Sequence, residues 1–232
     1  ENAQQLHANG GGSAEIKALY EISPLMGLKS RLGGNAQVAY ARGYCRNEET
    51  LKQQETNWQE KSLENGGGMQ QSTQRNNAET REQHAQLSEK RKMLRKEAVR
   101  LAADYDTVIF VGGLDHTYDC EGNDRADLVL PYEQDLLIRQ LLEVRSDLIV
   151  VLLAGSPVQM RDWIDQADTV VWSWYAGMEG GNALADVLLG RVNPSGKLPE
   201  SFYKTLTDCP AHAVGTFADG KTVSYREGCE VG

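Results

Sequence analysis

Three short apolar runs, separated by helical stretches, constrain the fold of this 232-residue chain more than any other feature. The runs lie at residues 108–111, 148–153 and 169–173. They lack the alternation of a half-exposed strand, so each is typical of a strand covered on both faces. Strand, helix and strand at this spacing predict βαβ units and a mostly parallel sheet. We therefore expect an α/β fold with helices on both faces of the sheet, a three-layer α/β/α sandwich.

The other elements are predicted from apolar spacing and from capping residues. Ser23 and Pro24 predict the start of a helix over 24–32. The pair Ser156-Pro157 predicts another over 158–166 by the same signals. Gly112-Gly113 should mark the end of the first strand. Further elements are expected as helices at 131–145, 182–189 and up to about Tyr105, and as strands at 37–41 and 200–203.

One segment differs in composition from the rest of the chain. From Cys45 to about Glu89 it is rich in Gln, Glu, Asn, Lys and Arg and has hardly any aliphatic residues. Such a segment buries too little apolar surface to form a core of its own. We therefore interpret residues 1–232 as one domain with a polar, partly mobile surface insertion at about 45–89, whose second half joins the long helix that ends near Tyr105.

Charge and motif content exclude several classes of function. The formal net charge is −9, whereas a nucleic-acid binder needs clustered Lys and Arg. No apolar run approaches the roughly 20 residues of a membrane span. Because CxxC spacing, a P-loop and GxGxxG are all absent, we expect no metal and no cofactor. The four cysteines, Cys45, Cys120, Cys209 and Cys229, permit a disulfide without requiring one. The chain contains no signal peptide, and its compartment stays open, with secreted and periplasmic locations both compatible.

The loop after the first apolar run is unusually rich in ionisable groups. Right-handed crossovers bring all strand-to-helix loops to one edge of a parallel sheet, so this loop should meet those at 154–157 and 174–181. Carboxylates and aromatic faces on one rim suit a neutral polyhydroxylated ligand, while solvated acidic surface is the simpler interpretation. A nucleotide fits poorly without a phosphate cradle. The groups are Asp115, His116, Tyr118, Asp119, Glu121, Asp124, Arg125 and Asp127.

The same loop resembles a motif of glycoside hydrolase family 3. Residues 121–125 and the LP and Gln that follow resemble the EGxDR…L.LP..Q signature of that family's C-terminal α/β sandwich domain. The resemblance covers nearly the whole chain outside the insertion. Its other matches, in the family's order, are GGGS at 10–13, SPL.GL at 23–28, AG.P at 154–157, the 174–181 loop, NPSGKLP at 193–199 and YREG at 225–228.

This resemblance implies a retaining exo-glycosidase, chiefly a β-glucosidase, acting on an oligosaccharide or glycoside. In such enzymes the nucleophilic Asp lies on an N-terminal barrel domain, and the acid/base Glu comes from the sandwich domain. Glu121 matches that Glu. The chain is then a fragment that starts after the sandwich's first strand and should not turn over substrate by itself. Without the nucleophile carboxylate nearby, the pKa of Glu121 should be more ordinary than in the intact enzyme.

Other residues of the rim receive secondary roles. Asp119, two residues away, is the nearest competitor of Glu121 for the acid/base role. A β-xylosidase of the same family and a non-catalytic carbohydrate-binding or assembly module are the alternative functions. An EF-hand is excluded, because Asp124 stands where Gly is required. The candidates for substrate binding are His116, Tyr118, Asp119 and Trp174, with packing as the alternative for His116 and Tyr118, and Asp124 and Arg125 are expected to orient the loop as an ion pair.

Overall fold

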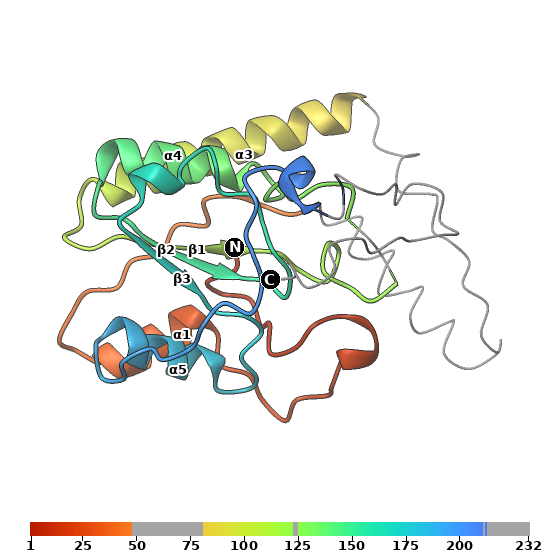
Figure 1. The fold of residues 1–232 in the computed structure, drawn as a ribbon. Helices are drawn as coiled ribbons and strands as arrows, with labels where there is room; N and C mark the ends of the chain where they lie inside the picture. The colour runs from red at the N-terminus through yellow and green to blue at the C-terminus, as the bar shows by residue number, and fades with distance from the viewer. Residues whose placement is uncertain (48–80, 123–124, 211, 213–232) are drawn as a thin grey trace.

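A three-stranded parallel sheet forms the centre of the protein (Figure 1). The computed structural model describes residues 1–47, 81–122, 125–210 and 212. The strands β1 (Ile109–Gly113), β2 (Ile149–Leu153) and β3 (Thr169–Trp172) lie in the order β1-β2-β3. Ile149 pairs with Ile109 on one side and with Thr169 on the other. The predicted α/β class and parallel strands are confirmed.

Helices cover both faces of this sheet, as predicted. In Figure 1, α3 (Arg81–Ala102) and α4 (Gln134–Val144) lie on one face, and α1 (Pro24–Leu32) and α5 (Gly180–Leu188) lie on the other. Short 3₁₀ turns at Gly12–Ala14, Ile164–Gln166 and Leu206–Asp208 complete the described elements. No helix among the described residues has both the length and the apolar composition to cross a membrane.

The apolar run of β2 feeds two separate cores. Val150 and Leu152 pack with Leu137 and Ile138 of α4, whereas Val151 and Leu153 pack with Leu184 of α5 and Val111 of β1. Successive side chains of a strand point to opposite faces. A strand with a core on each side must therefore be apolar at every position, which is the pattern seen in the sequence.

Glycine allows α1 and α5 to pack closely. A Cβ atom on Gly27 would lie 2.0 Å from the carbonyl oxygen of Gly181, so neither helix tolerates a side chain at the crossing. Ser23 caps α1 by accepting a hydrogen bond from the Met26 N–H at 3.3 Å. The ion pair of Arg31 and Asp186, at 2.9 Å, joins the two helices beyond the crossing. The sequence signals for α1 are thus confirmed.

Strand β1 ends at Gly113, so the two glycines mark its end as predicted. Gly113 has φ of 127°, and a Cβ there would lie 1.9 Å from the carbonyl oxygen of Leu153. The fully buried side chain of Gln134, at the start of α4, pairs with this strand end. Its Oε1 accepts from the Gly113 N–H, and its Nε2 donates to the Gly113 carbonyl, both at 2.8 Å. This pairing fixes the point where the chain leaves the sheet. The loop that begins there carries the ionisable residues from Asp115 to Asp127 and is called the acidic loop.

The prediction of a helix over 158–166 is wrong, because Ser156, the expected capping residue, makes a long-range contact instead. The Ser156 hydroxyl donates to Asp119, and the Gln159 N–H donates to the Leu128 carbonyl at 2.7 Å. The segment therefore runs as a loop along the acidic loop. Within it, only the turn at Ile164–Gln166 has helical backbone.

Four other predictions also differ from the structure. Residues 37–41 and 200–203 form no strand, because none of the described residues provides a neighbouring ladder for them. Helix α3 ends at Ala102 and not near Tyr105. Cys45 is fully buried and belongs to the core, so the polar segment does not begin there. The rest of the predicted insertion, at 48–80, and the YREG match lie outside the described residues.

Asp135 gives the fold a specific dependence on pH. Its Oδ1 accepts a hydrogen bond from Trp163 Nε1 at 2.6 Å, and burial raises its pKa to about 6 from 3.8. A carboxyl group with a raised folded-state pKa binds its proton more tightly when folded. It therefore stabilises the fold at acidic pH, and this contribution is lost as pH rises from about 4 to 6.

Replacing Asp135 with Asn should remove this pH dependence. Asp135→Asn keeps an oxygen acceptor for Trp163 and cannot ionise, so the variant should exceed the wild type in unfolding free energy at pH 7 by about 2–3 kcal/mol. At pH 4 the two should differ little. Urea denaturation at both pH values measures the difference, with the exposed Asp168→Asn as the control. An equal offset at pH 4 and pH 7 would contradict this role of Asp135.

Candidate active site

Three strand-to-helix loops converge on Asp119 at the carboxyl edge of the sheet. Its Oδ2 accepts hydrogen bonds from the Gly155 N–H at 2.5 Å and from the Tyr175 hydroxyl at 2.9 Å. Its Oδ1 accepts one from the Ser156 hydroxyl at 2.9 Å. Gly155 and Ser156 follow β2 and Tyr175 follows β3, so the predicted convergence of the loops is confirmed.

Glu121 lies on the same rim, against the glycine-rich segment 10–13. Its Oε2 accepts a hydrogen bond from the Ser13 N–H at 2.7 Å, and a parallel bridge joins Gly11 to Cys120 beside it. Gly12 has φ of 81°, and a Cβ there would lie 2.5 Å from the Cβ of Glu121. This close approach explains why the segment needs glycine. The carboxyl group itself is exposed to solvent.

The electrostatic surroundings of Glu121 favour its charged form. Hydrogen bonding from Ser13 lowers the pKa of Glu121 below the ordinary value. A general acid needs the opposite shift. Within the described residues, no second carboxylate opposes the ionisation of Glu121 in the way a nucleophile would.

A buried polar cluster lies behind the rim and was missed by the sequence analysis. Asp115, which is 1% exposed, forms an ion pair with Arg46 at 3.1 Å and accepts from the Tyr132 hydroxyl at 2.9 Å. Arg46 also lies 3.0 Å from Nε2 of His7. Burial, reinforced by the Arg46 charge, lowers the pKa of His7 to about 4. His7 is therefore neutral and accepts from Arg46. Arg46 was overlooked because it lies within the stretch interpreted as a polar insertion.

His116 and Tyr118, two candidates for substrate binding, are both engaged with protein. Nε2 of His116 donates to the Asn9 carbonyl at 2.7 Å, and the ring lies edge-on to Tyr175 with centroids 6.3 Å apart. The Tyr118 ring packs edge-to-face on Tyr132 at 5.5 Å. Packing, the alternative considered for both residues, accounts for these contacts.

Trp174 lies on the loop after β3, and Arg125 lies on the loop after β1. Trp174 has φ of 52° and packs edge-to-face on Trp172 at 5.8 Å. The Arg125 guanidinium donates to the Pro157 carbonyl, which ties the acidic loop to the loop after β2, and burial lowers the pKa of Arg125. Asp124, its predicted ion-pair partner, lies outside the described residues.

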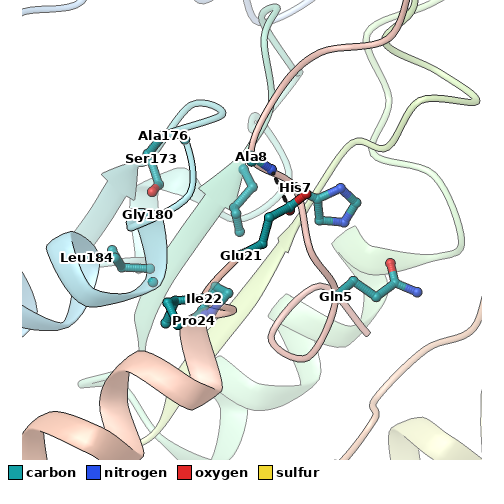
Figure 2. A pocket seen from close by; sticks show the side chains of 13 residues that line it. Gln5, His7, Ala8, Glu21, Ile22, Pro24, Ser173, Ala176, Gly180 and Leu184 are labelled. Atoms are coloured by element: carbon teal, nitrogen blue, oxygen red, sulfur yellow. Dashed lines mark hydrogen bonds between the residues drawn. The ribbon is translucent and has the colours of Figure 1, made fainter. Parts of the chain in front are cut away.

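A small cavity below the rim has too little space to hold a sugar. It lies between the segment around Ala8 and helix α5, and its volume is about 20 Å³, close to the space of one water molecule. Figure 2 shows the side chain of Glu21 reaching toward Ala8, whose N–H donates to Glu21 Oε2 at 3.1 Å.

Fold and rim together define a class: an α/β sandwich domain that presents a glutamate at the strand ends. The chain belongs to the family described as the glycosyl hydrolase family 3 C-terminal domain, whose model matches residues 1–232. The resemblance seen in the sequence motifs is confirmed. The chain is 38% identical over 237 aligned residues to beta-glucosidase BoGH3A of Bacteroides ovatus, covering 100% of this chain and 27% of that protein. It is 43% identical over 136 residues to thermostable beta-glucosidase B of Acetivibrio thermocellus, covering 59% of this chain and 18% of that protein.

Solved structures show the same architecture. A family 3 beta-glucosidase from Bifidobacterium adolescentis matches with a TM-score of 0.62 and 27% identity, over 91% of this chain and 27% of that one. A family 3 exo-beta-xylosidase, solved with a xylobiose aziridine probe, matches with a TM-score of 0.58 and 26% identity, over 85% of this chain and 20% of that one. The chain thus spans about a fifth to a quarter of the length of these relatives.

Proposed function

We propose that the longer protein carrying this domain is a retaining exo-acting β-glycosidase, a β-glucosidase, and that Glu121 is its acid/base residue. The observation that carries the proposal is the position of Glu121, which stands on the exposed rim where three loops converge. The names of the relatives described above support a β-glucosidase activity, since both proteins are named as beta-glucosidases. A barrel domain elsewhere in the protein would contribute the nucleophilic carboxylate.

In the first chemical step, Glu121 would donate its proton to the glycosidic oxygen while the nucleophile attacks the anomeric carbon. The bond between the anomeric carbon and the leaving oxygen breaks, and the leaving group departs as a neutral alcohol. In the second step the Glu121 carboxylate takes a proton from water, and the oxygen of that water displaces the nucleophile. Together, the two steps return the enzyme to its starting charge.

Glu121 must be protonated when the glycoside binds, although hydrogen bonding in this domain lowers its pKa. Two changes would raise the pKa in the assembled site: a nucleophile carboxylate placed nearby and removal of water by the bound sugar. The role of Glu121 as an acid therefore depends on the second domain.

The pH profile of the full-length enzyme tests this role. In wild type, kcat/KM should fall at high pH as Glu121 loses its proton. Glu121→Gln cannot ionise, so its residual kcat/KM on an activated aryl glucoside should lose that basic limb. A non-catalytic sugar-binding module predicts instead an unchanged profile, together with sugar affinity in the isolated domain by calorimetry, and that pair of results would rule the proposal out.

A β-xylosidase is the second candidate, favoured by the similarity to the solved family 3 exo-beta-xylosidase. The described rim residues do not distinguish glucose from xylose. Comparing kcat/KM of the full-length enzyme on aryl β-glucosides and aryl β-xylosides decides between the two activities.

A further inference from the structure

We propose that Asp119 is a positioning residue for the acid/base Glu121 and not a ligand of the sugar. This inference rests on the proposed function of Glu121. The geometry that carries it is the set of hydrogen bonds around the Asp119 carboxylate, which joins the acidic loop to the loops after β2 and β3.

The carboxylate of Asp119 is already occupied by protein donors. A carboxylate has about four acceptor positions, two on each oxygen. Oδ2 accepts from Gly155 and Tyr175, and Oδ1 accepts from Ser156, so three of these positions are used. Among the residues that the structure describes, no donor occupies the remaining acceptor position on Oδ1, so Asp119 offers one position to a ligand and is a poor partner for a pair of sugar hydroxyls.

The backbone of Asp119 is held as firmly as its side chain. Its N–H donates to the Asp115 carbonyl at 2.8 Å, and its carbonyl accepts from the Gly11 N–H at 3.4 Å. Asp119 thus connects the end of β1, the glycine-rich segment and two further loops at one point. Burial and the Asp119 charge together raise the pKa of Tyr175, so its hydroxyl stays protonated and remains a donor.

Glu121 follows this fixed point by two residues, a span of at most about 7 Å. On its other side, Gly122 has φ of 72°, and a Cβ added there would meet no atom within 4 Å, so no contact at Gly122 helps to position Glu121. The position of Glu121 is therefore set by Asp119 behind it and by the Ser13 N–H beside it. Proton transfer is sensitive to a displacement of about 1 Å, which can cost about 100-fold in rate.

The test is a double-mutant cycle in the full-length enzyme with two glucosides, one with a poor leaving group and one with an activated aryl leaving group. Asp119→Asn should lower kcat/KM about 10- to 100-fold on the poor leaving group and far less on the activated one. In a Glu121→Ala background the same change should have little further effect, because Asp119 acts through Glu121. The inhibition constant of free glucose should stay within about twofold of wild type.

Two milder variants test the same set of hydrogen bonds without changing Asp119. Tyr175→Phe and Ser156→Ala each remove one donor and should show the same contrast between substrates at a few-fold level. Tyr20→Phe is the matched control, since the Tyr20 hydroxyl donates to Glu179, another carboxylate, at 2.6 Å. It should show no contrast.

Different failures point to different errors. If Asp119→Asn raises the glucose inhibition constant and keeps its full effect in the Glu121→Ala background, Asp119 binds the sugar and the inference is overturned. Equal losses on both substrates also overturn it, since they indicate general damage. If Glu121→Ala itself shows no contrast between substrates, the proposed function fails, and the positioning role fails with it.

Discussion

Glu121→Ala in the full-length enzyme should lower kcat/KM by about 10²- to 10⁴-fold on glucosides with poor leaving groups. An alkoxide is a poor leaving group without a proton, so the loss of the acid is felt fully in the first step. An activated aryl glucoside needs no proton, and its kcat/KM should change by less than about tenfold. On that substrate kcat should still fall, because the second step lacks its base and the glycosyl-enzyme accumulates. Steady-state and pre-steady-state kinetics measure these effects.

The control for this prediction is Glu15→Ala, which removes an exposed carboxylate beside the glycine-rich segment. It should leave kcat/KM on both substrates near wild type. If Glu121→Ala loses the same factor on both substrates, or if Glu15→Ala reproduces the contrast, Glu121 is not the proton donor.

Gly12→Ala should also reduce activity strongly, by an entirely local displacement of Glu121. The added Cβ would lie 2.5 Å from the Glu121 Cβ and 3.0 Å from its Oε2, so the carboxyl group must move away from Ser13. We expect a loss of about 10²-fold in kcat/KM on poor leaving groups. The positive φ of 81° adds a cost of about 1 kcal/mol in unfolding free energy.

Gly177→Ala separates the two effects. Gly177 has a similar φ of 79°, but a Cβ there would have no atom within 4 Å. This variant should show the same small loss in thermal stability with little change in kcat/KM. Equal loss of activity in both variants would indicate that backbone strain, and not contact with Glu121, is responsible.

The sequence predicted those parts of the fold that depend on local pattern. Apolar runs identified β1, β2 and β3 because each faces two cores, and Ser23-Pro24 identified the start of α1 because the cap is satisfied within the helix. The same signal failed at Ser156, whose hydroxyl donates to a residue 37 positions earlier in the chain. Local capping rules cannot anticipate such a contact.

The site was predicted to a similar extent. Topology alone brought the loops of Asp119, Gly155 and Tyr175 to one edge, and the family motif singled out Glu121. Sequence reasoning missed the pairing of Asp115 with Arg46, because an arginine within a stretch interpreted as a polar insertion gives no sign of burial. The glycine-rich segment was recognised in the sequence only as a match to the family pattern, and its contact with Glu121, 108 positions away from Ser13, became visible only in the structure.

The most direct measurement is the product formed by the Glu121→Ala enzyme from an activated aryl β-glucoside in the presence of azide. Azide needs no base and fits the space left by the carboxyl group, so it should attack the glycosyl-enzyme in place of water. We predict restored turnover and a glucosyl azide of β configuration, identified by NMR. Absence of that adduct from Glu121→Ala, together with its formation by Asp119→Ala, would show that the proton comes from Asp119.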